Sequence, residues 1–311
     1  MNTPILLMVY IKPETTIKII ERLQDIEPKK IYISINIPTK ENEKEIIKNK
    51  KVVNILKKIN WKCKIKYKKR KKHVDAFTSY KEAIEWFFKN EKEGIILEDD
   101  TLPNVSFFKF CSKMLKKYRH NKKISQICGS SFKNFKKTDD FYFFSNYNLC
   151  WGYATWRRSI LDFDEKMLSW NKLKKENYLY EIVNDKKFVF YWTSIFEQQF
   201  KKKFRAWDYL WLYSNWKKKK VSIIPKKHLV KNIGFVKDAT HTKIKYKDWY
   251  NDLNTEELEI TNLHPKTQTA DNDYDKWISK TVFRVNKIYF KKKILNNKIY
   301  KKLNSIKKYF R

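Results

Sequence analysis

Three consecutive carboxylates, Glu98, Asp99 and Asp100, directly follow the apolar run Ile95-Ile96-Leu97. A short uninterrupted run of this kind is typical of a β-strand that is buried on both faces. Because unpaired carboxylates are costly to bury, we expect them at the carboxyl end of the strand, where α/β sheets bind ligands. Such oxygen ligands suit a hard divalent cation, Mn²⁺ or Mg²⁺, that holds the phosphates of a substrate. A solvated acidic turn is the alternative.

A fourth carboxylate, Asp208, lies between large aromatic residues in the segment Arg205-Ala206-Trp207-Asp208-Tyr209-Leu210-Trp211. Aromatic neighbours exclude water from a carboxylate and thereby tend to raise its pKa. A more basic carboxylate suits a general base that takes a proton from a sugar hydroxyl. Asp208 is therefore the candidate catalytic base. The alternative is a helix N-terminal Asp that accepts hydrogen bonds from free backbone N–H groups.

Glycine is scarce, with four in the whole chain, so each is expected to meet a backbone requirement. Gly152 lies between Trp151 and Tyr153, where the backbone would approach a ligand and the rings would stack on a sugar or base. Packing alone explains this pattern about as well.

A second glycine segment, Asn232-Ile233-Gly234-Phe235, is followed by the polar segment Asp238-Ala239-Thr240-His241-Thr242. A loop of this composition would close over a diphosphate, and His241 would add a metal ligand. The alternative is a structural histidine, which is the more common role of a single His.

Hydrophobic periodicity predicts the strands and helices that position these residues. Strand-like and helix-like patterns alternate over the first hundred residues. This alternation predicts a Rossmann-like parallel sheet covered by helices. The aromatic-rich segment 147–245 is expected to be irregular. Expected strands cover 5–10, 31–36, 63–67, 95–97, 124–128 and 141–145, and expected helices begin near Pro13, Glu41 and Pro103, with a further helical face over 80–88.

The charge of the chain is extreme, with 70 basic and 34 acidic residues among 311 and a net charge of +36. One interpretation is attraction to phosphate in nucleic acid, anionic lipid or a nucleotide. The other is compositional bias, because the excess is nearly all Lys and accompanies abundant Ile, Asn, Tyr and Phe. The basic runs 62–72 and 280–311 are the segments in which the charge would have a function.

Other features of composition narrow the class of protein. The four cysteines lack CxxC spacing, which predicts reduced thiols in a cytosol and no zinc ribbon. No run of about 20 apolar residues occurs, which argues against a transmembrane span or signal peptide. We therefore expect a cytoplasmic protein. Phe283, Val285, Ile288, Tyr289 and Phe290 interleave with Lys in the tail, which would allow peripheral contact with an anionic membrane.

Taken together, these segments resemble the nucleotide-diphospho-sugar transferases of the GT-A superfamily over roughly residues 4–245. The motifs are similar to ILEDD, P-x-x-S-F-F, WGWATW-R, WDYQW and N-I-G-F…D-A-T-H-T of one bacterial group. Their order is also similar to that in the animal enzyme that adds the first branching N-acetylglucosamine to N-glycans. Here they read Ile96-Leu97-Glu98-Asp99-Asp100, Pro103-Asn104-Val105-Ser106-Phe107-Phe108, Trp151-Gly152-Tyr153-Ala154-Thr155-Trp156-Arg157-Arg158, Trp207-Asp208-Tyr209-Leu210-Trp211 and Asn232 through Thr242.

The resemblance implies a role for each matched residue. Asp100 would bind Mn²⁺ (or Mg²⁺), which would bridge the two donor phosphates. Asp99 would contact the ribose or a metal-bound water, and Glu98 the donor sugar or a bound water. Asp208 would be the base of an inverting displacement, and His241 would lie near the diphosphate or the metal.

The chain also departs from the family pattern at the donor site. Asn36 stands where the family has an Asp that binds the nucleotide base, and an amide offers a different set of donors and acceptors. Lys12 replaces a common Arg as the expected cation, and Tyr153 replaces the second Trp of WGW. The predicted donor site therefore consists of Lys12, Asn36, Glu98, Asp99, Trp151 and Gly152.

The sequence thus predicts an α/β fold of GT-A type with a mixed central sheet over residues 1–250 and a basic helical extension over 251–311. Within the first part, 1–130 would be the nucleotide-binding half and 131–250 the acceptor half. The predicted activity is metal-dependent inverting transfer from a UDP-sugar donor to a glycan or lipid-linked saccharide. A nucleotidyltransferase is disfavoured because Met8–Glu14 contains no Gly for a phosphate loop. The alternative is a basic protein that binds nucleic acid or anionic membrane without catalysis; for the enzyme, no specific nucleic acid partner is expected.

Overall fold

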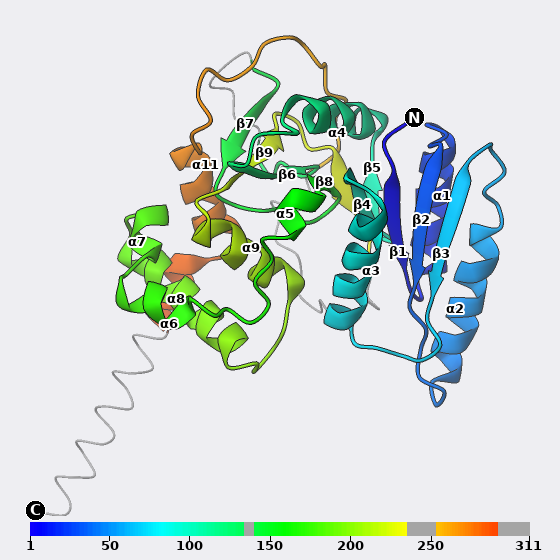
Figure 1. Ribbon diagram of the computed structural model, residues 1–311, viewed down its shortest axis with the longest axis horizontal. Helices are drawn as coiled ribbons and strands as arrows, with labels where there is room; N and C mark the ends of the chain where they lie inside the picture. Colours follow the sequence, from blue (N-terminus) through cyan, green and yellow to red (C-terminus); the bar gives the residue numbers. More distant parts are fainter. Residues whose placement is uncertain (134–139, 235–252, 292–311) are drawn as a thin grey trace, which may run out of the picture. The chain divides into compact units, whose positions relative to one another are not determined.

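The computed structural model describes residues 1–133, 140–234 and 253–291, and the chain forms two compact units. Unit 1 contains residues 1–163 and 206–271, and unit 2 contains 164–205 and 272–311 (Figure 1). The predicted boundary at residue 250 between a GT-A domain and a basic extension stays a prediction. Among the described residues, no helix is long and apolar enough to cross a membrane.

Unit 1 is built on an eight-stranded mixed sheet with the order β3-β2-β1-β4-β8-β6-β9-β7. The first four strands of this order are parallel, β8 runs antiparallel to both β4 and β6, β9 is parallel to β6, and β7 is antiparallel to β9. The predicted mixed α/β architecture is therefore confirmed. The strands are β1 (Ile5–Val9), β2 (Lys30–Ile35), β3 (Lys64–Lys69), β4 (Glu93–Glu98), β6 (Ile124–Cys128), β7 (Tyr142–Ser145), β8 (Tyr153–Trp156) and β9 (Val221–Pro225), and a separate pair joins β5 (Thr101–Pro103) to β10 (Val230–Asn232).

Helices cover both faces of the sheet because successive strand residues point to opposite sides. Ile5 and Ile33 belong to a core that includes residues of α1 (Pro13–Gln24), α2 (Glu43–Leu56) and α4 (Val105–Lys117). On the opposite face, Tyr32 packs its ring 5.1 Å from the ring of Phe87 in α3. Unit 1 also contains α3 (Ala76–Asn90), α5 (Arg157–Ile160) and α9 (Trp207–Lys217).

The register of the central strands brings the expected site residues to one edge of the sheet. Met8 of β1 pairs with Glu98 of β4 in a parallel ladder, so the segments after both strands leave the sheet side by side. Because β8 is antiparallel, its first residue, Tyr153, pairs with Ile96 near the carboxyl end of β4. The Trp151-Gly152 segment therefore enters the sheet next to the acidic turn.

Unit 2 is a small helical assembly formed by two stretches that are distant in sequence. Its helices are α6 (Trp170–Lys175), α7 (Leu179–Ile182), α8 (Lys186–Phe200) and α11 (Asn272–Trp277), followed by a π-helical turn, η1 (Ile278–Val282). Trp192 of α8 is fully buried, and the ring of Phe283 lies 4.9 Å from it.

The expectation of an irregular segment over 147–245 is wrong, because the segment contains β8, α8 and α9. Closely spaced aromatic residues concealed the hydrophobic periodicity of these elements in the sequence.

The described part of the basic tail packs within unit 2. Val285 is 3% exposed, and the Tyr289 ring lies 5.3 Å from the ring of Phe190. Among the described aromatic residues of the tail, Phe290 is exposed, at 49%. Val285 and Tyr289 thus pack within unit 2, and membrane contact of the tail stays a prediction.

Candidate functional site

The three acidic residues lie in the tight connection between β4 and β5. Thr101 fixes this turn, because its Oγ1 accepts a hydrogen bond from the Glu98 backbone N–H at 2.9 Å and donates to the Glu98 carbonyl at 3.1 Å. Asp99 and Asp100 follow the last strand residue and are 6% and 9% exposed. The carboxylates are thus held by backbone geometry at the carboxyl end of β4, as the sequence predicted.

Two groups from the end of β1 contact the acids. The Tyr10 backbone N–H donates to Asp99 Oδ2 at 2.9 Å, and Lys12 Nζ donates to Asp100 Oδ2 at 2.5 Å. Lys12 immediately precedes Pro13, the first residue of α1, so the start of that helix anchors the ammonium beside the acids. The structure therefore brings the predicted cation and the predicted metal ligand into direct contact.

The pKa values in the turn are shifted by burial and by the several carboxyl groups that lie around the Lys12 ammonium group. Burial, followed by the charges of Asp100 and Asp99, raises the pKa of Glu98 to about 8. Burial also raises the pKa of Asp99 to about 7, although the charge of Lys12 opposes this shift. Burial lowers the pKa of Lys12, but the nearby carboxylates outweigh it and the net shift is upward. The acids of the turn outnumber the Lys12 ammonium. Glu98 and Asp99 are shifted towards the protonated form, and a further cation would stabilise their ionised form.

Asp208 lies in the first turn of α9, where its side chain is exposed to solvent. The surrounding chain nevertheless desolvates the carboxylate and raises its pKa, while its own and the Tyr209 backbone N–H oppose the shift. Asp208 is close enough to Glu98 for its charge to raise the pKa of that residue. The preceding residue, Trp207, stacks on Phe163 with ring centroids 4.2 Å apart and fixes the start of the helix. The predicted base thus belongs to the same electrostatic cluster as the acidic turn.

A pair of tyrosines beside this cluster was not anticipated from the sequence. Tyr80 of α3 donates a hydrogen bond to the Tyr153 hydroxyl at 3.3 Å, and the Tyr80 ring lies 5.3 Å from the Trp207 ring. Burial raises the pKa of both phenols, so both stay protonated. The pair links α3, β8 and α9 behind Glu98 and Asp208. A helical apolar face was the only sequence signal at Tyr80, and it indicated packing.

Asn36, the predicted base-binding residue, follows β2 and is 7% exposed. Its amide Nδ2 donates to the Val74 carbonyl at 2.9 Å, whereas its Oδ1 is buried and has no hydrogen-bond partner among the described residues. Asn49 of α2, which the sequence did not single out, donates to the Asn36 carbonyl at 2.9 Å and to the Tyr10 carbonyl at 2.6 Å. This amide ties the ends of β1 and β2 together.

The Trp151-Gly152 segment has structural constraints of its own. Gly152 adopts a φ of +59°, a conformation that favours glycine, and its carbonyl accepts a hydrogen bond from the Gly129 N–H at 2.8 Å. The Trp151 ring lies 5.1 Å from the Phe132 ring. Packing and backbone geometry therefore account for both residues, and their contact with a donor stays a prediction.

The second glycine segment reaches the acids through the β5–β10 pair, in which Asn232 is opposite Thr101. The Ile233 N–H donates to the Asp100 carbonyl at 2.8 Å. Gly234 lies so close that a Cβ there would be 2.2 Å from Asp100 Oδ2. His241, the other predicted metal ligand, lies outside the described residues, as do Asp238 and Thr242.

The chemistry of the donor set fits a hard divalent cation. Carboxylate oxygens such as those of the acidic turn are its preferred ligands. Within the described ranges, however, no three Asp, Glu, His or Cys side chains converge as a complete metal cage. A divalent cation here would take its remaining ligands from substrate phosphates and water. Asp100 is the residue that would hold it.

Comparison with protein-family models and with curated proteins gives no match for this chain. Among solved structures, 4-diphosphocytidyl-2C-methyl-D-erythritol synthase from Anaerococcus prevotii DSM 20548 is similar at 10% identity and a TM-score of 0.37, covering 72% of this chain and 88% of that one. HddC from Yersinia pseudotuberculosis, complexed with GMP-PN, has 13% identity and a TM-score of 0.32, with 52% and 80% covered. An apo-UDP-glucose pyrophosphorylase has 9% identity and a TM-score of 0.35, with 72% and 90% covered.

At such low sequence identity and TM-score, the similarity to these solved structures assigns no activity to the chain. Function depends on the site, not on the fold, and enzymes of different chemistry share architectures of this kind. The fold class rests on the strand order and helix placement of unit 1 itself.

Proposed function

We propose that the protein is a metal-dependent glycosyltransferase that moves a sugar from a nucleotide-diphospho-sugar, of UDP type, to a hydroxyl of a glycan or lipid-linked saccharide. The single observation that carries the proposal is the pairing of Lys12 with Asp100 at the carboxyl ends of β1 and β4, with Glu98, Asp99 and Asp208 in the same cluster. A site of this charge pattern suits a diphosphate that arrives with its cation.

Each element of the site has a chemical task in this proposal. Lys12 would hold the donor phosphates, and Asp100 would hold Mn²⁺ or Mg²⁺, which neutralises charge on the departing nucleoside diphosphate. Asp208 has the raised pKa and the solvent access that a base needs to take a proton from the acceptor hydroxyl. Inversion at the sugar carbon follows from the family resemblance.

The Asn36 side chain supports a preference for uracil. Its buried Oδ1 lacks a hydrogen-bond partner among the described residues, and a buried acceptor of this kind is costly until it is paired. The imide N–H of uracil is a donor, whereas the equivalent ring nitrogen of cytosine is an acceptor. Asn36 would therefore accept a hydrogen bond from the imide N–H of the uracil in a UDP-sugar.

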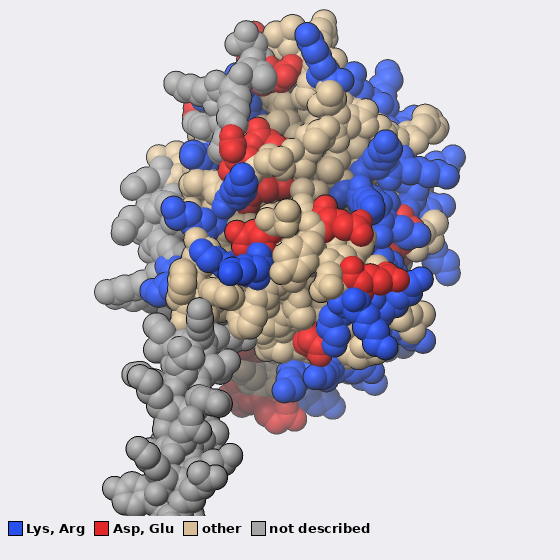
Figure 2. Space-filling view, turned by 90° about the vertical axis from the view of Figure 1, so that its left-hand side faces the viewer, with Lys and Arg blue, Asp and Glu red and all other residues tan. Residues whose placement is uncertain are grey.

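The basic binding alternative receives less support. In the run 62–72, Lys66 donates to Asn90 Oδ1 at 2.9 Å, Lys68 donates to the Glu82 carbonyl at 3.0 Å, and Arg70 is ion-paired with Glu82. These basic side chains hold β3 against α3. Figure 2 shows Lys and Arg spread over the visible face with Asp and Glu among them, as expected for a solvated surface.

The test is an assay of nucleoside diphosphate release and sugar transfer with a panel of UDP-, GDP-, CDP- and dTDP-sugars, with Mn²⁺, Mg²⁺ or chelator. Transfer that requires metal and is lost in Asp100→Ala is the expected result. Release of a nucleoside triphosphate from a nucleotide sugar and pyrophosphate would identify a nucleotidyltransferase instead. Salt-sensitive RNA binding without turnover of any donor would favour the basic binding protein.

A further inference from the structure

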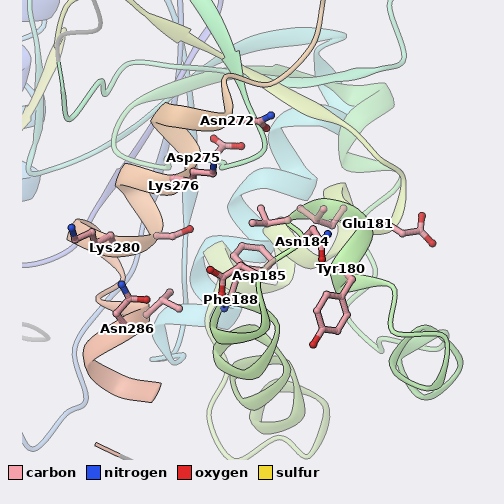
Figure 3. Close-up of a pocket in the computed structure, with 14 residues that line it drawn as sticks. Tyr180, Glu181, Asn184, Asp185, Phe188, Asn272, Asp275, Lys276, Lys280 and Asn286 are labelled. Carbon is pink, nitrogen blue, oxygen red and sulfur yellow. Dashed lines mark hydrogen bonds between the residues drawn. The ribbon is translucent and has the colours of Figure 1, made fainter. Parts of the chain in front are cut away.

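Unit 2 contains a cavity of about 550 Å³, which falls in the range of roughly 300–1,000 Å³ usual for ligand sites. One wall is α11 with η1, and the other is the segment that leads from α7 into α8 (Figure 3). Phe188, Val285 and Asp275 are 1%, 3% and 1% exposed, so the cavity has a buried base under a solvent-exposed rim.

The polar lining is rich in groups that bind hydroxyls. Three carboxamides, those of Asn184, Asn272 and Asn286, belong to the cavity, and each supplies both a donor and an acceptor. In Figure 3, Asn272 and Asp275 on α11 lie opposite Asn184 and Asp185 at the start of α8. Sugar hydroxyls also donate and accept hydrogen bonds, and the C–H faces of a sugar ring pack on apolar groups such as Phe188.

Asp185 is fixed as a hydroxyl acceptor by its own helix. Its Oδ1 accepts from the Lys187 N–H at 2.6 Å and the Phe188 N–H at 3.1 Å, which caps α8. Both bonds use the same oxygen, so Oδ2 keeps its acceptor capacity. A carboxylate held by capping loses little entropy when it binds a ligand.

The charged side chains of the lining nearly balance, which does not favour an anion such as phosphate. Three carboxylates, Glu181, Asp185 and Asp275, line the cavity against two ammonium groups, Lys276 and Lys280. The whole chain has the opposite balance, with 70 basic and 34 acidic residues. A cavity with a slight acidic excess in so basic a protein suits a neutral ligand better than an anion.

We infer that this cavity binds a neutral saccharide segment, and, resting on the proposed function, that the segment belongs to the acceptor. Binding in unit 2 would keep an acceptor chain attached to the polypeptide that carries the transfer site. Lys12, Asp100 and Asp208 belong to unit 1 and do not line the cavity, so variants of the two sites can be tested independently.

Saturation-transfer NMR on the full-length protein tests the inference, with methyl β-glucoside, methyl β-galactoside and methyl β-N-acetylglucosaminide as probes. At least one glycoside is expected to bind. Affinity should fall about fivefold to tenfold in Asn184→Ala and in Asn272→Ala, each of which removes one amide. Asn171→Ala, an exposed amide on α6 outside the cavity, is the matched control. Asp185→Ser retains a helix cap but lacks the second oxygen, and it should also weaken binding.

Three outcomes would overturn the inference: no binding of any glycoside, equal binding in the cavity variants and in Asn171→Ala, or displacement of the glycoside by inorganic phosphate. Asp100→Ala is expected to bind the glycoside as the wild type does, because its change lies in unit 1. Glycoside binding without sugar transfer from any donor would contradict the proposed function and leave the cavity assignment standing.

Discussion

Lys12 Nζ lies 2.5 Å from Asp100 Oδ2, across the carboxyl ends of two adjacent parallel strands. The pair joins the residue just before α1 to the last acid of the β4–β5 turn. The β1–β4 register places Lys12 beside Asp100. The Lys12 side chain is also less exposed than the many solvated lysines of this chain. The ammonium is therefore placed to meet a diphosphate that approaches the acids.

Replacing Lys12 with Met keeps most of the side-chain length but removes the charge. The donor should bind about 10- to 150-fold more weakly, the loss expected for a hydrogen bond to a charged group. Calorimetric titration of the donor with Mn²⁺ present measures this. Lys18→Met, an exposed change on the same helix, serves as the control. Equal donor affinity in the two variants would contradict the phosphate-binding role of Lys12.

Asp208→Asn should separate binding from chemistry. The amide has the shape of the carboxylate but cannot accept the proton of the acceptor hydroxyl, so kcat should fall by about 10²- to 10⁴-fold. Donor affinity should stay near the wild-type value, because the assigned donor contacts come from other residues. Asp25→Asn, at the exposed end of α1, controls for loss of one negative charge. A kcat close to wild type in Asp208→Asn would exclude Asp208 as the base.

Gly234→Ala should damage the site without unfolding the protein. The added Cβ would lie 2.2 Å from Asp100 Oδ2 and 2.8 Å from Asp100 Cβ, so the acid must move. A displacement of this size at a reacting centre can cost about 10²-fold in rate. Steady-state kinetics and thermal unfolding of the same sample distinguish this effect from a loss of stability.

Gly94→Ala provides the matched comparison in the core. Its Cβ would meet Phe87 Cζ at 2.3 Å and the Pro4 carbonyl oxygen at 2.8 Å, which overpacks the interior at a cost of about 1–3 kcal/mol. Gly94→Ala should lower Tm while the activity per folded molecule persists. If Gly234→Ala lowers Tm as much as Gly94→Ala and retains its rate, the backbone at 234 has no special relation to Asp100.

Much of the site was accessible from the sequence because it depends on local patterns. The apolar run before Glu98 fixed both the strand and the position of the acids at its end. Aromatic neighbours correctly indicated a raised pKa for Asp208. The Lys12–Asp100 contact depends on β1 and β4 being parallel neighbours; the alternation of strands and helices predicted a parallel sheet but not this strand order.

The parts that could not be predicted depend on contacts between distant segments. β8 inserts antiparallel between β4 and β6, and nothing in Tyr153–Trp156 specifies that neighbour pair. Unit 2 joins 164–205 to 272–311, which share no sequence motif. The Asn49 amide is a single polar residue in a lysine-rich helix, and its role appears only when the ends of β1 and β2 lie beside it.

His228 predicts how stability responds to acid. The ring is 1% exposed, Nδ1 accepts a hydrogen bond from the Ser131 N–H at 3.2 Å, and burial, followed by the charge of Lys231, lowers the pKa to about 4. An unfolded histidine has a pKa of about 6.5. Between these values the unfolded chain binds more protons than the folded one, so the free energy of unfolding falls as the pH falls. From pH 7 to pH 5 the loss is about 2 kcal/mol.

Urea unfolding at these two pH values measures the effect in the wild type and in His228→Asn, whose Oδ1 can accept from Ser131 but does not titrate. His120→Asn, an exposed change, is the control. Glu98 and Asp99 have raised pKa values and contribute the opposite trend, with stability falling as the pH rises. Their contribution is common to all three proteins and cancels in the difference. A pH dependence as steep in His228→Asn as in the wild type would show that the buried histidine is not the group that binds the proton on unfolding.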